Sequence, residues 1–351
     1  MSANAIPGFT CPAPLATRDT VLLGHGSGGK LSGELVRDIF LPAFANPELA
    51  QLNDQAVVTI GGARIAITTD TFVIRPLFFP GGDIGSLAVH GTVNDLAVGG
   101  AQPLFLSAAF IIEEGFSMDE LRRIVQSMQG AALAAGVQIV TGDTKVVEHG
   151  KGDGLFINTT GIGLVPAGCV LSADRARAGD RILINGSIGE HGIAILAQRE
   201  GLEFESTIES DCAALHSLCA QVLQASSEVR CLRDLTRGGL SSALNEIAAQ
   251  SRIGIELDES AIDVREQVRG ACEMLGLDPL YVANEGKLIA IVAPDAAEDV
   301  LAAMRSHPLG RNSEIIGTVT ESHPNLVTMK TSLGTARIVD MLAGDQLPRI
   351  C

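Results

Sequence analysis

The sequence predicts an α+β (α/β) protein of two domains, an N-terminal domain with a mixed sheet and a C-terminal α/β domain. Three observations support this fold class: 351 residues exceed one typical domain, 46% hydrophobic residues supply a large core, and strand-like and helix-like segments alternate in both halves. Pro, Gly and short polar residues gather over 166–180, which marks a junction. We expect an arm with a glycine-rich loop (1–42), an N-terminal domain (43–165), a C-terminal domain (166–342) and a flexible tail (343–351).

Composition excludes several classes of protein. The net charge of −16 argues against a general nucleic-acid binder, which needs a basic surface. No apolar run reaches the roughly 18 residues that would span a membrane, and no secretory signal is visible at the start. The seven cysteines are scattered and form no CxxC pair, which is typical of a reduced, cytoplasmic protein.

A glycine-rich segment, GHGSGGK at 24–30, follows three apolar residues and nearly matches a Walker A loop. Leu31 stands where a Ser or Thr hydroxyl is required, and the usual α/β surroundings are missing. We therefore exclude a P-loop fold, although the segment remains a candidate phosphate cover. A short helix is expected over 35–40, ended by Pro42.

The N-terminal domain is expected to begin with a hairpin, strands 56–60 and 64–69 around a Gly-Gly turn. A strand at 104–112 and a helix capped by Ser117 and ended by Gly136 follow. A short strand at 137–140 comes next, with Thr141 to Lys145 at or just past its end. A strand at 155–165 completes this domain.

The stretch from 66 to 103 carries the most informative pattern. A strand ends at Asp70, and a helix begins after a glycine-rich bend with Asp83 as its N-cap. Gly91 and Asp95 are four residues apart and share one helix face. Asp54 precedes the first strand and is expected to face Asp70. This set suits an anion and its divalent cation; the alternative is a capped helix with solvated acids.

The C-terminal domain is expected to contain the strands 181–184, 252–257, 288–292, 313–319 and 326–329, and the helices 192–199, 210–224, 241–250, 263–275 and 296–305. A loop over 233–239 stands out among them. Asp234 and Thr236 supply hard oxygen ligands, and Arg237 offers a fork for phosphate beside two glycines. The alternative is an ordinary helix N-cap at Thr236.

The sequence ends in Pro-Arg-Ile-Cys, with Cys351 as the last residue given. An extended tail from 343 reaches on the order of 30 Å, enough to carry a thiol into a pocket of its own or a neighbouring subunit. The terminal carboxylate is expected to raise the thiol pKa, and Arg349 to offset this. A disordered end is the alternative.

Several motifs together resemble one family, the HypE hydrogenase maturation proteins. They are TTDTFV (68–73), FPGGDIGSLAVHGTVNDLAVGGA (79–101), GDTKVV (142–147), INGSIGEHGIAI (184–195), DLTRGGL (234–240), NEGK (284–287) and PRIC (348–351). The family usually has DPTRGG where this chain has Leu235, which keeps the Asp, Thr and Arg. It belongs to an ATP-binding superfamily shared with aminoimidazole ribonucleotide synthetase and selenophosphate synthetase.

The resemblance implies an enzyme that pairs into a homodimer through its N-terminal domains and uses ATP and Mg²⁺. A carbamoyltransferase, HypF, would place a carbamoyl group on Cys351. ATP-dependent dehydration would convert this group to a thiocyanate. The cyanide would then pass to iron on the HypC–HypD complex, for the [NiFe]-hydrogenase centre.

The resemblance also implies roles for particular residues. The Mg²⁺ ligands would be Asp54, Asp95 and Asp234. The nucleotide site would be lined by Asp70, Thr71, Asp143, Thr236 and Arg237, with Asp143 as an alternative metal ligand. Lys145 and Glu285 are the candidates for removing the amide protons from the group on Cys351. Lys145 would need a depressed pKa for this; otherwise it neutralises phosphate charge.

Two other functions remain open from the sequence. One is an ATP-dependent kinase or amidine synthetase that acts on a free small molecule on the same scaffold. The other is a non-catalytic scaffold that binds a nucleotide as a switch. Modification of Cys351 would distinguish the family's activity from both.

Overall fold

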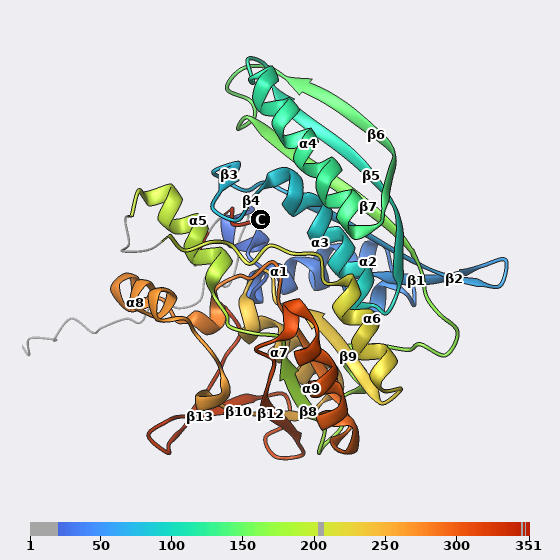
Figure 1. The fold of residues 1–351 in the computed structure, drawn as a ribbon, viewed down its shortest axis with the longest axis vertical. Coiled ribbons are helices and arrows are strands. Elements are labelled where there is room, and N and C mark those ends of the chain that lie inside the picture. Colours follow the sequence, from blue (N-terminus) through green and yellow to red (C-terminus); the bar gives the residue numbers. More distant parts are fainter. Residues whose placement is uncertain (1–19, 203–206, 345–346, 348) are drawn as a thin grey trace, which may run out of the picture.

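The computed structural model describes residues 20–202, 207–344, 347 and 349–351 (Figure 1). The first nineteen residues of the predicted arm and part of the predicted tail lie outside this description. Two mixed sheets form the framework, one of five strands and one of seven. The predicted α+β fold is therefore confirmed.

Short helical turns precede the first sheet. Leu23–Gly26 is a 3₁₀ turn, and α1 (Lys30–Leu35) continues through a π-helical turn, Val36–Phe40, into α2 (Leu41–Ala43). The prediction that Pro42 ends a helix is wrong. Pro42 lies in the first turn of α2, where a missing backbone N–H costs little.

The first sheet carries two helices on one face. Its strands have the order β1-β2-β7-β5-β6, and only β5 and β6 are parallel. A small ribbon, β3 (Phe78–Phe79) with β4 (Gly82–Asp83), leads into α3. The elements are β1 (Ala56–Ile60), β2 (Ala63–Phe72), α3 (Ile84–Val98), β5 (Gln102–Glu113), α4 (Met118–Ala135), β6 (Gln138–Val147) and β7 (Leu155–Leu164).

One strand differs from its prediction in a way that matters for the site. β6 continues to Val147, so Asp143 and Lys145 lie within a strand and not beyond its end. Asp143 is the register partner of Ala109, and Lys145 that of Ile111. Pairing with the long neighbour β5 extends the strand through Gly142, Asp143 and Lys145, whose own strand propensity is low.

The second sheet has the order β14-β13-β10-β12-β8-β11-β9, and only β10 and β13 are parallel. Most of its predicted elements are present, while β9 and β14 were not predicted. The elements are β8 (Arg181–Ile184), α5 (Glu190–Glu200), α6 (His216–Ala225), β9 (Val229–Asp234), α7 (Gly239–Ser251), β10 (Gly254–Asp258), α8 (Glu266–Leu275), β11 (Leu288–Val292), α9 (Ala297–Ser306), β12 (Glu314–Thr320), β13 (Val327–Lys330) and β14 (Ala336–Ile338).

The helix predicted from residue 210 begins only at His216. The preceding residues form no helix, because their backbone bonds to distant parts of the chain. Ser210 N donates to Pro80 O at 2.8 Å, and Ala213 N donates to Glu285 O at 3.4 Å. These long-range bonds replace the local ones that a helix would make.

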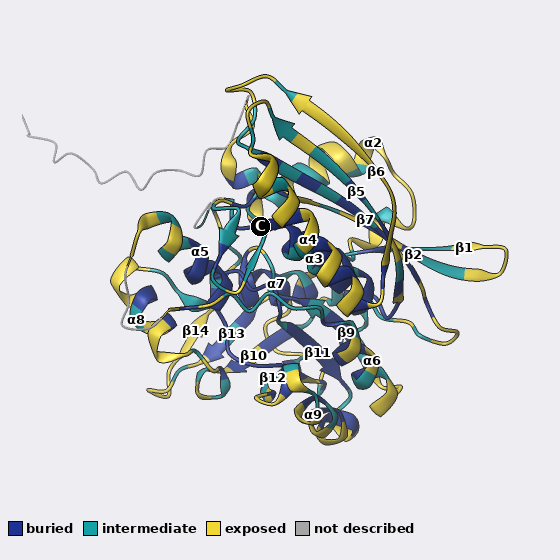
Figure 2. Cartoon of the chain, turned by 45° about the horizontal axis from the view of Figure 1, so that its top comes forward, coloured by how far each residue is buried: buried dark blue, intermediate teal, exposed yellow. Residues whose placement is uncertain are grey.

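Helix α3 joins the two halves of the molecule. It packs on β2, β5 and β7 of the first sheet and also contacts α6 and β9 of the second half. Accordingly it is buried around most of its circumference (Figure 2). Helix α4 has one apolar face and is exposed on the other. Among the described residues, no helix has the length and apolar character to cross a membrane.

Candidate functional site

Three aspartates from separate elements meet between the two halves of the molecule. Asp54 precedes β1, Asp95 lies on α3, and Asp234 ends β9; one carboxylate oxygen of each lies within 4.8 Å of the others. The Thr68 hydroxyl is 2.8 Å from Asp95 Oδ2, and Arg233 Nε is 3.2 Å from Asp54 Oδ1. Carboxylate oxygens at this spacing are the donor set that a hard divalent cation prefers.

Burial and mutual repulsion dominate the electrostatics of this acidic cluster. Desolvation raises the pKa of Asp234 to about 8, with the Asp54 charge adding to the effect. It also raises the pKa of Asp95 well above its ordinary value, again reinforced by the neighbouring aspartates. Three carboxyl groups cannot all ionise here at low cost, so a divalent cation would relieve the repulsion. The donor set therefore fits Mg²⁺.

Asp70 approaches the same region because α3 lies close to β2. A side chain at Gly91 would come within 2.9 Å of the Phe72 ring and 3.6 Å of Asp70 Oδ2, so a glycine permits this packing. Desolvation raises the pKa of Asp70, while Arg237 lowers it and Asp54 raises it. Asp54 therefore lies within electrostatic reach of Asp70.

The glycine-rich loop covers the start of α7. Arg237 Nη1 donates to Gly26 O at 2.7 Å, and a side chain at Gly28 would meet the Arg237 backbone at 2.7 Å. Ser27 Oγ donates to Gly344 O at 3.1 Å, which ties the loop to the C-terminal segment. The alternative of an N-cap at Thr236 is wrong, because Gly238 caps α7. The loop is therefore placed over the guanidinium that was predicted to bind phosphate.

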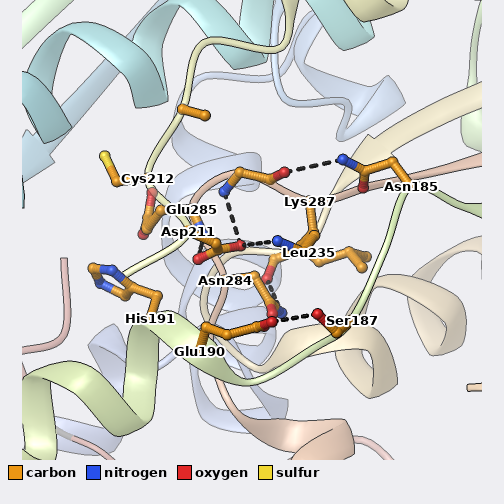
Figure 3. Close-up of polar contacts among 12 residues, drawn as sticks. Asn185, Ser187, Glu190, His191, Asp211, Cys212, Leu235, Asn284, Glu285 and Lys287 are labelled. Atoms are coloured by element: carbon orange, nitrogen blue, oxygen red, sulfur yellow. Dashed lines mark hydrogen bonds and ion pairs between the residues drawn. The ribbon is translucent and has the colours of Figure 1, made fainter. Parts of the chain in front are cut away.

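Glu285 lies in a loop whose backbone is tightly held. Asp211 accepts from Glu285 N at 3.0 Å and from Lys287 Nζ at 3.0 Å (Figure 3). Asn94, on α3, donates to Glu285 O at 3.3 Å. The Glu285 side chain is buried, and its Oε1 has no hydrogen-bond partner among the described residues. Burial raises its pKa well above the ordinary value.

The C-terminal residue lies inside the molecule, between α5 and α3 (Figures 1 and 2). Cys351 is 8% exposed, and Val73 N donates to Cys351 O at 3.0 Å. Burial raises the pKa of the Cys351 thiol to about 12; Arg237 lowers it, and Glu285 raises it. The thiol is thus within electrostatic reach of both candidate site residues. It is protonated in this state.

Three predicted site residues lie elsewhere in the chain. Thr71, Asp143 and Lys145 share the face of the first sheet opposite to α3, because successive residues of a strand point to opposite faces. Lys145 Nζ pairs with Asp143 Oδ2 at 2.7 Å in an exposed ion pair. The structure does not bring these side chains to the acidic cluster of the same chain. Their roles stay predictions that require a second subunit.

Sequence reasoning missed two buried residues that organise the site. Asp211 holds the loop of Glu285, and His191 contacts the C-terminal segment: its Nε2 is 2.7 Å from Ile350 O. His191 lies within the segment used for the family resemblance, but no role was assigned to it. Neither contact is signalled by spacing, since 159 residues separate His191 from Ile350 and 74 separate Asp211 from Glu285.

Comparison with known proteins agrees with this architecture. Residues 52–165 match the AIR synthase related protein N-terminal domain, and residues 177–329 match the corresponding C-terminal domain. The carbamoyl dehydratase HypE of Azotobacter vinelandii is 60% identical over 332 residues, which cover 95% of this chain and 97% of that protein.

Two solved structures are similar over nearly their whole length. A HypE–HypF complex aligns with a TM-score of 0.84 at 49% identity, covering 88% of this chain and 99% of that one. HypE in complex with ATP aligns with a TM-score of 0.80 at 51% identity, covering 95% of this chain and 100% of that one. The chain therefore belongs to the HypE carbamoyl dehydratase family, within the AIR synthase related proteins.

Proposed function

We propose that this chain uses ATP to dehydrate an S-carbamoyl group on its own Cys351 to a thiocyanate. The single observation that carries the proposal is the burial of Cys351 within electrostatic reach of Arg237, Glu285 and Asp234. A sulfur on a chain end that reaches this position can present an attached group to residues from both halves of the molecule. A relative that is 60% identical is named a carbamoyl dehydratase.

The chemistry removes oxygen from an amide by making it a better leaving group. The carbamoyl oxygen attacks the γ-phosphorus of ATP, the bond to ADP breaks, and an iminophosphate forms on the sulfur-bound carbon. The nitrogen then loses its remaining proton while the carbon–oxygen bond breaks. Phosphate leaves with that oxygen, and the carbon and nitrogen are joined as a nitrile. Both amide protons go to bases.

Glu285 is the group we assign to proton removal within the same chain. Its backbone is fixed by Asp211, and its carboxylate oxygen Oε1 has no partner among the described residues. A raised pKa brings a carboxylate closer to the range in which a general base works near neutral pH. Arg237 would hold phosphate charge, with Asp70 and Thr236 lining the nucleotide.

Asp54, Asp95 and Asp234 would hold Mg²⁺. When bound, the ion neutralises negative charge on the phosphates of ATP. The chain's own contribution is to keep three carboxylates together in a buried place. Thr68 and Arg233 fix the orientation of two of them by direct contacts.

The open face of the first sheet supports a homodimer. Exposed apolar side chains follow one another across its strands: Ile162 on β7 is the register partner of Ile67 on β2 and of Phe105 on β5. Lys145 shares this face. Pairing of two such faces would cover the apolar residues and bring Lys145 and Asp143 to the partner subunit. That arrangement would give both residues their predicted roles.

The tail must also meet other proteins. A relative has been solved in complex with HypF, which we propose as the carbamoyl donor for Cys351. The HypC–HypD complex is the proposed acceptor of the cyanide, as the family resemblance implies. Acyl transfer requires a free thiol, and the described cysteines are all free. This agrees with a reducing compartment such as the cytoplasm.

Intact-mass measurement tests the proposal directly. After incubation with HypF, its carbamoyl substrate and ATP, we expect an adduct on Cys351 that then loses the mass of one water. Cys351→Ala should keep its ATP affinity and form neither adduct. A nitrile on the protein in that variant would overturn the assignment of the tail. Phosphorylation of a free small molecule without any adduct would favour the kinase alternative.

A further inference from the structure

We propose that His191 is a positioning residue that fixes the C-terminal peptide in the site by binding the carbonyl of Ile350. This inference rests on the proposed function, in which Cys351 carries the reacting group. No motif assigned this role to His191. It follows from the hydrogen bonds that surround a fully buried imidazole.

The imidazole of His191 lies in the first turn of α5 and is 0% exposed. Its Nε2 is 2.7 Å from Ile350 O, and its Nδ1 is 2.8 Å from Ser210 Oγ. The imidazole ring makes an edge-to-face contact with the ring of Phe79, with centroids 5.6 Å apart and ring planes at 87°. Both nitrogen atoms of the ring therefore have partners, and the side chain is fully buried.

These contacts determine the tautomer. A carbonyl oxygen only accepts, so Nε2 must carry the proton that it donates to Ile350 O. Burial lowers the pKa of His191, which keeps the ring neutral, so Nδ1 accepts from the Ser210 hydroxyl. Ser210 Oγ in turn accepts from Cys212 N at 3.1 Å. The chain of donors and acceptors thus has one direction, from Cys212 N through Ser210 and His191 to the tail.

The bonded carbonyl belongs to the peptide that joins Ile350 to Cys351. Because Val73 N also binds Cys351 O, the last residue is held on both sides of its Cα. Holding both ends of one residue limits where its side chain can point. His191 thereby sets the direction of the Cys351 sulfur toward Glu285 and Arg237.

Other contacts of the tail are of a different kind. Arg349 pairs with Asp153, which also pairs with Arg75, and Arg349 Nε donates to Val73 O at 3.0 Å. These groups are partly exposed, with side-chain exposures of 31% for Arg349 and 27% for Asp153. Exposed ion pairs hold the tail weakly and tolerate small shifts. The buried bond from His191 is the one that sets position next to the reacting sulfur.

The two residues Ser210 and Asp211 also connect the tail to Glu285. Ser210 binds His191, and the next residue, Asp211, accepts from Glu285 N. In Figure 3 the side chains of His191, Glu285 and Cys212 lie on one side of Asp211. A docked tail and a correctly placed Glu285 are therefore held by two adjacent residues.

This geometry predicts which steps depend on His191. Carbamoylation needs the tail to leave the site and meet another protein, whereas dehydration needs it docked. The bond to Ile350 O exists only in the docked state. Loss of His191 should therefore slow dehydration without slowing carbamoylation.

The experiment compares His191→Ala, His191→Gln and the control His307→Gln in the full-length protein with HypF and ATP. His307 also pairs with a serine, Ser217 Oγ at 3.1 Å, but makes no hydrogen bond to the described residues of the tail. We expect His191→Ala to dehydrate its carbamoyl group about 10-fold to 100-fold more slowly, as misplacement of a reacting group does. Its carbamoylation rate and ATP affinity should stay at wild-type levels.

A second readout does not depend on the chemistry. Iodoacetamide should alkylate Cys351 several-fold faster in His191→Ala than in the wild type, as followed by peptide mapping. His191→Gln should restore part of both properties, because its amide nitrogen can replace Nε2 as the donor. If His191→Ala folds poorly, His191→Gln provides the test in its place.

Unchanged alkylation together with an unchanged dehydration rate in both His191 variants would overturn the inference. Equal loss of carbamoylation, dehydration and ATP binding would also overturn it, since that would indicate a general structural role. If the wild type forms no thiocyanate but alkylation still depends on His191, the docking role stands and the proposed chemistry fails. The two proposals can thus be separated.

Discussion

At the scale of single residues, Glu285 combines a fixed backbone with a side-chain oxygen that lacks a partner. Its amide nitrogen binds Asp211, its carbonyl accepts from Asn94, and Oε1 has no hydrogen-bond partner among the residues described. A buried carboxyl oxygen that makes no hydrogen bond lowers the stability of the folded state. Such a cost is typical of a group kept for chemistry.

Replacing Glu285 by Gln tests this role. The variant should fold and bind ATP, because the amide has nearly the same shape and the backbone contacts remain. Dehydration of the carbamoyl group on Cys351 should fall by roughly 10²–10⁴-fold, the usual contribution of a positioned base. The rate is measured by intact mass in single-turnover reactions.

A matched control for this variant is Glu228→Gln. Glu228 pairs with Arg230 in an ion pair remote from the tail, and its side chain is half exposed. This control should react at the wild-type rate. Normal turnover in Glu285→Gln would remove Glu285 from the chemistry and leave Lys145 as the candidate base.

At the scale of elements, the acidic cluster depends on three segments that converge. The segment just before β1, the last turn of α3 and the end of β9 each contribute one aspartate. None of these elements could form the site alone. Their convergence brings like charges together, and the packing of the rest of the fold must offset the resulting repulsion.

This convergence makes stability depend on pH. The folded-state pKa of Asp234 is about 8, while an unfolded aspartate has a pKa of about 3.9. Between these values the folded state binds more protons than the unfolded state, so the stability of the metal-free protein falls as pH rises through about 8. We expect the melting temperature in EDTA to fall between about pH 6 and about pH 9.

Magnesium should reverse this trend. Ligand carboxylates must be deprotonated to bind a cation, so MgCl₂ should raise the melting temperature more at about pH 9 than at about pH 6. Asp95→Asn should reduce both the fall in EDTA and the rise with MgCl₂. A melting temperature that does not respond to Mg²⁺ at either pH would contradict the assignment of the metal site.

The elements also show why some predictions succeeded. The hairpin turn, the N-cap at Asp83 and the helix ended by Gly136 depend on neighbours in sequence, and all three are present. The helix start predicted at 210 was wrong, because the backbone of this segment bonds to Pro80 and Glu285 instead of to its own neighbours. Local patterns cannot register such distant partners.

At the scale of the whole molecule, the open face of the first sheet leaves several apolar side chains exposed in the single chain. β6 is exposed along nearly its whole length (Figure 2). The apolar side chains of the neighbouring strands lie on the same face as Lys145. A second copy of the chain is the partner we propose for this face.

A charge placed on that face should separate the subunits. Ile162 is 40% exposed in the single chain, so Ile162→Glu should leave the fold intact. We expect the wild type to sediment as a dimer and Ile162→Glu as a monomer. If Lys145 acts across the interface, the monomer should also lose dehydration while keeping Cys351 carbamoylation.

Ile338→Glu provides the control for this experiment. Ile338 is 61% exposed on β14, at the edge of the other sheet. That variant should remain a dimer with normal activity. A wild-type protein that is monomeric at all accessible concentrations would rule out the proposed pairing.

The sequence by itself determined the fold class, the family and the aspartates that meet in one cluster. These properties depend on periodicity, capping and short motifs, each of which is encoded within a few neighbouring residues. The family resemblance implied Asp54, Asp95 and Asp234 as metal ligands, and the structure brings the three carboxylates together.

Only the tertiary structure decided which face of the sheet each residue occupies and where the tail lies. Asp70 and Thr71 are adjacent in sequence, yet they point to opposite sides because of the pleat. His191 and Ile350 meet across 159 residues, because α5 packs against the chain end. Contacts of that range arise from the packing of whole elements, which no local pattern records.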